Sequence, residues 1–244
     1  LSNVSFSYNE ELTLKDINMI FKPSTKTALV GESGSGKSTI IKLILGLNSN
    51  YAGSIKYDTF DIDTIPANKM SKIATLITND SYLVQGSIRS HLSVNKHITE
   101  EDMYNALEKV NLKDFVIENG GLDYELSCGA SNLSGGQKQR LLAAKAILKD
   151  SYIYILDEAV SNIDDYSKKI VLDAFDSIKN VKIIVVISHD LETITNSDNI
   201  YVLKDQQIIE EGTHEQLIDQ PSLYKKLFND QQQLKEKFLA KEVE

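Results

Sequence analysis

Apolar residues recur along the chain in two patterns, which alternate with each other. Short β-rich runs occur at VSFSY (4–8), INMIF (17–21), TALV (27–30) and SIKY (54–57), and unbroken apolar runs at YIYIL (152–156) and IIVVI (183–187). Unbroken apolar runs are typical of strands that are covered on both faces. Helical apolar spacing occurs in STIIKLILGL (38–47), in residues 99–118 and in SGGQKQRLLAAKAILK (134–149).

Cap and turn residues support these elements. Thr99 precedes Glu100, Glu101 and Asp102, which provides a helix cap and an acidic first turn. Ser134 is a capping serine at the start of the next predicted helix. IYVL and QIIE flank Lys204-Asp205-Gln206, which predicts a hairpin. Alternating strands and helices predict an α/β fold with a mainly parallel sheet.

The distribution of helix signals predicts the domain organisation. Residues 80–149 are richest in helix signals and are expected to form a helical subdomain. Residues 1–79 and 150–225 are expected to form the α/β core together with a β subdomain. Residues 226–244 end in QQQLKEKFLAKEVE, a charged segment of low complexity. We interpret this tail as a solvated helix or a frayed end, with a docking helix as the less favoured alternative.

Composition narrows the class of protein. The 244 residues are 41% hydrophobic and 25% charged, which is ordinary for a globular protein. A net charge of −9 disfavours nucleic-acid binding, because backbone phosphates attract Lys and Arg. The longest apolar run, residues 182–188, is far shorter than the ~20 residues that span a bilayer. Cys128 is the single cysteine, so no internal disulfide forms. The chain begins LSNVSF without methionine, which indicates part of a longer polypeptide.

A phosphate-binding motif lies between a predicted strand and a predicted helix. GESGSGKST (31–39) fits G-x-x-x-x-G-K-[ST], and its glycines allow the backbone N–H groups to face phosphate oxygens. Lys37 would neutralise phosphate charge and Ser38 would offer its hydroxyl to Mg²⁺. A chance glycine-rich turn is the alternative, and the strand–loop–helix context argues against it. The residues expected at the nucleotide are Gly31, Glu32, Ser33, Gly34, Ser35, Gly36, Lys37, Ser38 and Thr39.

An acidic pair follows the buried run YIYIL. Asp157 would hold Mg²⁺, directly or through water, and Glu158 would act as the general base on the attacking water. Such a pair is often only a solvated junction between strand and loop. The phosphate motif in the same chain makes the catalytic interpretation stronger.

A second anion-binding helix start lies at LSGGQ (133–137). Ser134, Gly135, Gly136 and Gln137 begin the predicted helix 134–149, where backbone amides favour an anion. One phosphate motif already serves one triphosphate. The second motif therefore suggests an ATP that is bound between two chains.

The motifs GESGSGKST, LSGGQKQR, ILDEAVSNID and VISHD, in that order, resemble the nucleotide-binding domain of ABC transporters. The resemblance covers almost the whole chain. YDTFDID (57–63), the run ending in GSIR and the C-terminal EEGTHEQLIDQPSLYKKLFNDQ are similar to the exporter type. The implied fold is a P-loop NTPase (RecA-like) core with an N-terminal antiparallel β subdomain and a helical subdomain.

The resemblance assigns further roles. Tyr8 resembles the aromatic residue that stacks on adenine, with an inward-facing strand residue as the alternative. His189 resembles the switch histidine that contacts the γ-phosphate, and Asp164 resembles the loop aspartate that crosses the dimer interface. The other histidines match no family motif and are expected at the surface; they are His91, His97 and His214.

Asn79, Cys128 and Gly129 depart from the family pattern. Asn79 stands where the family has a glutamine that meets Mg²⁺ and water, whereas Gln85 falls outside that register. Because asparagine is shorter by one methylene, we expect slower or less tightly coupled hydrolysis. Cys128 and Gly129 replace a glutamate and an arginine that the family associates with communication to membrane-domain loops. Cys128 is interpreted as a small residue without a redox function, although a redox sensor is the alternative.

The implied activity is Mg²⁺-dependent ATP hydrolysis that powers an exporter-type transporter through ATP-driven dimerisation. The implied partners are a transmembrane domain, fused upstream, and a second nucleotide-binding domain, identical or different; nucleic acid is not expected. The implied location is the cytoplasmic face of the cell membrane. A soluble ABC-type ATPase acting on nucleic acid or in protein assembly is the main alternative. A regulator without turnover is disfavoured because Glu158 and His189 are both present.

Overall fold

The computed structural model describes residues 1–242, and the chain divides into two compact units. Unit 1 comprises Leu1–Met70 and Val185–Glu244, and unit 2 comprises Ser71–Ile184. The chain passes from one unit to the other within α2 (Ala67–Ile73) and within β11 (Ile183–Ile187). Both units therefore contain strands and helices, as an α/β chain requires.

Unit 1 contains an antiparallel sheet with the strand order β2-β1-β4, in which β1 is Ser2–Tyr8, β2 is Glu11–Ile17 and β4 is Ala52–Ser54. Tyr8 pairs with Glu11 at the β1–β2 turn. Val4 and Phe6 are buried on one side of β1. The short strands β5 (Lys56–Tyr57) and β6 (Phe60–Asp61) form a separate hairpin, and η1 (Ile62–Thr64) follows it. This sheet is the antiparallel N-terminal part that the sequence predicts.

The second sheet of unit 1 contains the strand that leads into the phosphate motif. β3 (Thr25–Gly31) is parallel to β12 (Asn199–Lys204), and β12 is antiparallel to β13 (Gln207–Gly212). The hairpin predicted around Lys204-Asp205-Gln206 is therefore confirmed. The middle of β3 is continuously buried, and α1 (Lys37–Ile44) buries Ile40, Ile41 and Leu43. Continuous burial along a strand is what coverage on both faces produces.

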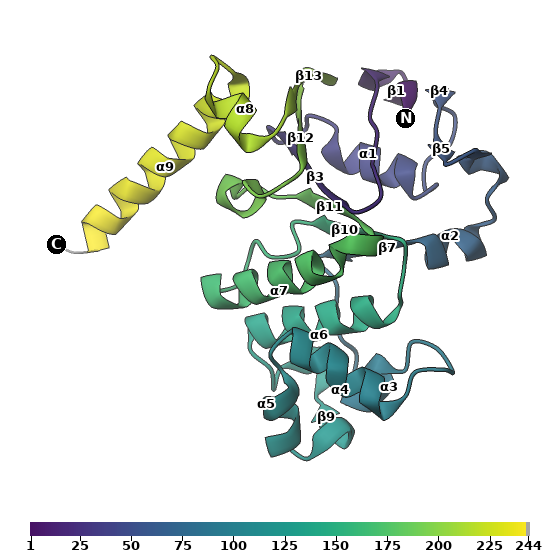
Figure 1. The fold of residues 1–244 in the computed structure, drawn as a ribbon, viewed down its shortest axis with the longest axis vertical. Helices are drawn as coiled ribbons and strands as arrows, with labels where there is room; N and C mark the ends of the chain where they lie inside the picture. The colour runs from purple at the N-terminus through teal and green to yellow at the C-terminus, as the bar shows by residue number, and fades with distance from the viewer. Residues whose placement is uncertain (243–244) are drawn as a thin grey trace. The chain divides into compact units, whose positions relative to one another are not determined.

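Three further elements of unit 1 follow β11. They are η5 (Leu191–Ile194), α8 (His214–Ile218) and α9 (Leu223–Glu242). A capping box starts α8, since Thr213 Oγ1 accepts from Gln216 N at 3.4 Å and Gln216 Oε1 accepts from Thr213 N at 2.9 Å. Figure 1 shows α9 as one long helix that follows α8. No helix in the described part of the chain is long and apolar enough to cross a bilayer.

Unit 2 contains a parallel strand pair and most of the helices. β7 (Ala74–Thr78) and β10 (Ile153–Asp157) are parallel, with Thr78 opposite Asp157. β8 (Gly86–Ser87) and β9 (Glu125–Leu126) form a short antiparallel pair. The helices are α3 (Ile88–Leu92), α4 (Glu100–Lys109), α5 (Lys113–Glu118), α6 (Gly135–Leu148) and α7 (Asp165–Ile178). Shorter 3₁₀ turns are η2 (Gly121–Asp123), η3 (Cys128–Ala130) and η4 (Lys179–Val181).

The helices of unit 2 pack on one another and on β7. Figure 1 shows α4, α6 and α7 side by side, and α6 contacts both of the others. Tyr154 of β10 and Phe175 of α7 are almost fully buried and their ring centres are 5.4 Å apart. The predicted cap at Thr99 is confirmed, because its side chain forms a capping box with Asp102. The helical segment 80–149 therefore lies within unit 2.

Several local predictions need correction. INMIF (17–21) is wrong as a strand, because the more polar segment Glu11–Ile17 pairs with β1 and residues after Ile17 leave the sheet. The helical stretch 99–118 is two helices, α4 and α5, since Asn111 between them has a left-handed φ of 50°. The tail expected as a solvated helix or a frayed end is helical as far as Glu242, so the helix alternative holds for the described residues, and residues 243–244 lie outside the described chain.

Candidate functional site

The phosphate motif of unit 1 is a tight loop between β3 and α1. Gly36 caps α1 with φ 104°, a left-handed conformation that favours glycine. A Cβ on Gly36 would lie 2.5 Å from Leu14 Cδ2, and one on Gly31 would lie 2.4 Å from the Leu203 carbonyl oxygen. Both glycines are therefore required by close packing as well as by the turn. The N–H groups of the loop and of the first turn of α1 are the donors that a phosphate would use.

Lys37 lies under this loop. Its side chain is buried, and its ammonium donates to the carbonyl oxygens of Gly31 at 2.8 Å and Glu32 at 2.9 Å. A longer contact of 3.4 Å joins Nζ to Ser35 Oγ. Ser38 is exposed on the first turn of α1, whereas Thr39 is buried. The cation is thus held inside the loop, and the Ser38 hydroxyl is accessible to a metal ion.

Tyr8 ends β1 with its ring at the surface. Tyr8 is 40% exposed, so the inward-facing alternative is not supported. Its hydroxyl accepts a hydrogen bond from Asn48 Nδ2 at 2.9 Å, and that bond lowers the Tyr8 pKa although the slight desolvation opposes it. Lys42 Nζ lies 5.9 Å from the ring centre, and Phe6 packs edge-on at 4.8 Å. Tyr8 is therefore fixed in place with part of its face open to a planar ligand.

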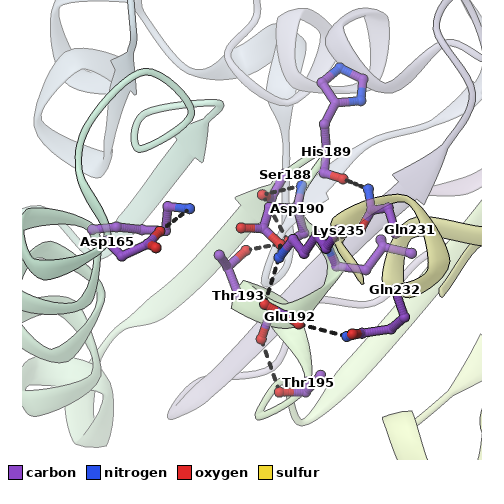
Figure 2. Close-up of polar contacts among 12 residues, drawn as sticks. Asp165, Ser188, His189, Asp190, Glu192, Thr193, Thr195, Gln231, Gln232 and Lys235 are labelled. Atoms are coloured by element: carbon purple, nitrogen blue, oxygen red, sulfur yellow. Dashed lines mark hydrogen bonds and ion pairs between the residues drawn. The ribbon is translucent and has the colours of Figure 1, made fainter. Parts of the chain in front are cut away.

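His189 follows β11 in unit 1. Figure 2 shows its imidazole pointing away from α9, while its backbone carbonyl faces that helix. Gln231 Nε2 of α9 donates to this carbonyl, and Gln231 Oε1 accepts from Leu191 N at 2.9 Å. His189 itself is exposed. The sequence motif identified the histidine but missed its partners on α9, since no cap or periodicity signal pointed to them.

The acidic residues of unit 2 lie at the carboxyl ends of two adjacent strands. Asp157 is the last residue of β10 and lies opposite Thr78, the last residue of β7. Asn79 follows Thr78 directly, in a turn where Ser81 Oγ accepts from Thr78 N at 3.1 Å. The parallel register therefore places Asn79 and Asp157 at the same edge of the strand pair. Gln85 is exposed and directly precedes β8.

Glu158 has an unusual backbone conformation. Its φ is 52°, in the left-handed region that costs a residue with a side chain about 1–2 kcal/mol. The turn is closed by Ser161, whose N–H and hydroxyl both donate to the Glu158 carbonyl, at 3.1 and 2.9 Å. Such strain in a half-buried acid directly after a buried strand is typical of a functional position.

The signature motif begins α6 of unit 2. Ser134 and Gln137 form a reciprocal capping box: Ser134 Oγ accepts from Gln137 N at 3.1 Å, and Gln137 Oε1 accepts from Ser134 N at 2.9 Å. A Cβ on Gly136 would lie 2.2 Å from Ser167 Oγ and 2.6 Å from Asp164 Oδ2, whereas one on Gly135 would meet nothing within 4 Å. The helix start that the sequence predicts is confirmed, and only the second glycine is packed.

Asp164 caps α7 in the same unit. Its Oδ1 accepts from Ser167 N at 2.8 Å, and this bond lowers the pKa of the carboxyl group. The side chain is exposed. Its structural contribution in this chain is therefore local, at the start of the helix that packs against Gly136.

Several sequence-predicted surface residues have different surroundings. His91 is wrong as a surface residue: it is 5% exposed, and its Nε2 lies 3.0 Å from the Val84 carbonyl oxygen. His97 is exposed as expected, while His214 is half-buried with Nδ1 2.9 Å from the Tyr224 hydroxyl. Cys128 is exposed, and Gly129 next to it has φ 63°, which explains a glycine at that turn.

A groove of about 550 Å³ opens beside β7 in unit 2. Its lining comes from β7, the following turn, α3 and the second half of α6, and comprises Thr75, Leu76, Ile77, Asp80, Ser81, Tyr82, Ser90, His91, Ser93, Val94, Leu142, Lys145, Ala146 and Lys149. Tyr82 is 79% exposed at its rim. Burial lowers the pKa of Lys149, and the nearby charge of Lys145 lowers it further. The groove therefore combines apolar surface with two lysines.

Comparison with known sequences finds one matching family model and many similar proteins. A sequence model of the family described as ABC transporter matches residues 14–161. An uncharacterized ABC transporter ATP-binding protein of Haemophilus influenzae is 38% identical over 97% of this chain and 42% of its own length. An ATP-dependent lipid A-core flippase of Saccharophagus degradans is 36% identical over 95% of this chain and 40% of its own. A mycobactin import ATP-binding/permease protein of Mycolicibacterium smegmatis is 37% identical over 93% and 26%, respectively.

Comparison with solved structures agrees with the sequence comparison. The structure of a bacterial Atm1-family ABC exporter with ATP bound matches with a TM-score of 0.87 and 27% identity, covering 94% of this chain and 41% of that chain. The chain thus spans less than half the length of each of these relatives. The predicted fold class, an α/β P-loop NTPase with a mainly parallel sheet, is confirmed.

Proposed function

Since the chain belongs to the ABC transporter family and corresponds to the ATPase domain of such transporters, we propose that it powers an exporter-type transporter by ATP-driven dimerisation. The observation that carries the proposal is the glycine loop between β3 and α1, which encloses the Lys37 ammonium. The capped signature helix α6 supports it, because a single nucleotide site does not need a second anion-binding helix start. The full transporter would place this domain at the cytoplasmic face of the membrane.

ATP binding would use unit 1. The Lys37 ammonium would exchange its two carbonyl partners for β- and γ-phosphate oxygens, and the N–H groups of residues 31–39 would donate to the same phosphates. Tyr8 would stack on adenine with its exposed face. Binding is thus an exchange of neutral acceptors for charged ones, which strengthens each hydrogen bond.

The residues present fit a magnesium ion that is bound together with ATP. The described residues contain no group of three or more His, Cys, Asp or Glu that could hold a metal ion. Mg²⁺ instead prefers one or two carboxylates, waters and substrate phosphates. Ser38, Asp157 and Asn79 supply oxygens of the required kind. The ion would neutralise charge that develops on the phosphates.

Hydrolysis would use one base and one orienting group. Glu158 would accept a proton from the attacking water, and His189 would contact the γ-phosphate and steady that water. The strained φ of Glu158 supports this role, because the turn at Ser161 fixes the carboxylate-bearing residue in one conformation. General-base positioning of this kind contributes about 10²–10⁴ in rate.

Two domains would pair so that each signature motif covers the nucleotide of the other. Ser134, Gly135, Gly136 and Gln137 would present the N-terminus of α6 to the γ-phosphate of the partner domain, and Asp164 would lie at the interface. The helical subdomain, residues 80–149, would carry this signature. Hydrolysis and phosphate release would then weaken the attraction and separate the domains.

The groove beside β7 would receive a segment of the membrane domain. Its apolar floor and the exposed Tyr82 favour a helix end, and Lys145 and Lys149 favour acidic or carbonyl groups on that helix. Asn79 follows β7 directly, so the groove adjoins the edge proposed for Mg²⁺. A soluble ATPase of protein assembly or nucleic acid is not favoured, because the named relatives are transport proteins.

The test compares Glu158→Gln with Glu101→Gln, an exposed glutamate at the start of α4. Glu158→Gln is expected to bind ATP, lose turnover and form an ATP-dependent dimer in light scattering with Mg²⁺ present. Glu101→Gln should hydrolyse ATP like the native chain. A Glu158→Gln variant with normal turnover would remove Glu158 from the base role, and a monomer under all conditions would refute the dimer.

A further inference from the structure

One face of α9 contacts the segment that carries His189. The Gln231 carboxamide bridges this segment, because Nε2 donates to the His189 carbonyl and Oε1 accepts from Leu191 N at 2.9 Å. Both ends of one side chain therefore satisfy backbone groups on either side of Asp190. Figure 2 shows Gln231 reaching this backbone from α9.

Lys235 lies one helical turn after Gln231 and reaches two carboxylates. Its ammonium is 3.1 Å from Asp190 Oδ1 and 2.6 Å from Glu192 Oε2. Gln232 Nε2 also donates to Glu192 Oε1, at 2.6 Å. The hydrogen bond from Lys235 lowers the pKa of Glu192, so the carboxylate is charged at neutral pH. We name Gln231, Gln232 and Lys235 the α9 clasp.

The clasp contacts a backbone segment that also forms hydrogen bonds within itself, between Ser188 and Thr193. Asp190 N donates to Ser188 Oγ at 3.0 Å, and Thr193 Oγ1 donates to the Asp190 carbonyl at 2.6 Å. The His189 ring points away from α9 and takes no part in the clasp. Gln231 thus fixes the peptide of His189 from the side opposite to the imidazole.

Placement of the imidazole depends on this backbone. His189 lies two residues beyond the end of β11, and its side chain is exposed. A displacement of about 1 Å at a reacting group can cost about 10²-fold in rate. A bond that fixes the carbonyl of the histidine itself is therefore well placed to control catalysis.

We propose that Gln231 and Lys235 of α9 are positioning residues for His189. Gln231 holds its peptide, and Lys235 holds the next two acidic residues of the segment. The inference rests on the proposed contact of His189 with the γ-phosphate. It adds a positioning role to two residues of the tail that the sequence predicts as a solvated helix or a frayed end.

The matched test uses pairs of like residues on the same helix. Gln231→Met should lower kcat about fivefold to tenfold, the loss expected for one or two hydrogen bonds, while the Kd for a fluorescent ATP analogue changes less than twofold. Gln233→Met is exposed on another face and should leave both unchanged. Lys235→Met should lower kcat by a smaller factor, about twofold, and Lys237→Met should not.

Hydrogen exchange of the peptide 188–194 separates positioning from general stability. Gln231→Met should accelerate exchange in this peptide and not in the peptide that covers α1, with an unchanged melting temperature. An unchanged kcat in Gln231→Met, together with a large loss in His189→Ala, would overturn the inference and leave the proposed function standing. A normal kcat in His189→Ala would instead refute the role of His189, and the inference with it. A loss of kcat with equal losses of ATP affinity and thermal stability would show that the clasp is only structural.

Discussion

Gly136→Ala tests whether the signature motif is shaped by packing within the chain. The new Cβ would lie 2.2 Å from Ser167 Oγ, 2.6 Å from Asp164 Oδ2 and 2.8 Å from Ser167 Cβ. Ser167 is 2% exposed, so rotating its hydroxyl does not remove the contact with its Cβ. α6 and α7 must therefore separate, or Asp164 must leave its bond to Ser167 N.

The expected cost follows from the two neighbouring glycines. Inserting a methyl group into a packed contact costs about 1–3 kcal/mol. Gly135→Ala meets nothing within 4 Å and replaces glycine in a helix, which gains up to about 0.5–1 kcal/mol. Gly136→Ala gains the same helix propensity, so the two variants should differ by the packing cost alone, about 1–3 kcal/mol in the free energy of unfolding, with Gly136→Ala the less stable.

Urea unfolding of both variants, followed by circular dichroism, measures this difference. Gly135→Ala is the control, because it makes the same residue change in the first turn of the same helix. Helix propensity alone would therefore change the free energy of unfolding equally in both variants. Equal stability of the two alanine variants would refute the packing argument. It would mean that the contact between α6 and α7 relaxes without cost.

Four other outcomes are expected. Burial lowers the pKa of His91 in the folded chain below its ordinary value of about 6.5, so the unfolded chain binds more protons. The free energy of unfolding that His91 contributes above pH 6.5 is therefore lost as the pH falls toward the pKa of the folded state. Urea titrations between pH 7.5 and 5.5 should show a shallower dependence of this free energy on pH in His91→Gln than in His97→Gln, and equal slopes would contradict this. Asn79→Gln should raise the rate of ATP hydrolysis or change its Mg²⁺ dependence, and indistinguishable kinetics would reject the effect of the shorter side chain. Removal of Mg²⁺ with EDTA should abolish turnover, while persistent hydrolysis would exclude the proposed metal role. Tyr8→Ala should weaken ATP-analogue binding about fivefold or more by loss of stacking, with Tyr8→Phe near native, and equal affinities would remove Tyr8 from the adenine contact.

The sequence predicted the main elements because their signals are local. An apolar run bounded by polar residues sufficed for β3, β10 and β11, and cap residues sufficed for α4 and α6. β2 was missed because Glu11–Ile17 contains few strand-forming residues and depends on β1 for its partners. Long-range pairing of this kind leaves little trace in a single sequence.

The candidate site was predictable where a motif carries the chemistry. Residues 31–39 and 133–137 specify their own turns and helix starts, so both were placed correctly on their elements. The α9 clasp was not predictable, since Gln231 is separated from His189 by many residues and glutamine has no distinctive pattern. The burial of His91 was missed for the same reason, because its partner is the Val84 carbonyl and carries no side-chain signal.

The parallel register of β7 and β10 has a mechanical consequence. Thr75, Leu76 and Ile77 line the groove, and Thr78 at the end of the same strand lies opposite Asp157. β7 is thus a short strand with the proposed docking surface along its length and Asn79 directly after its last residue. No loop separates the groove-lining residues of β7 from Asn79, so a small displacement of β7 by a docked helix would also displace Asn79. Binding of the partner would therefore change the position of Asn79 relative to the nucleotide directly.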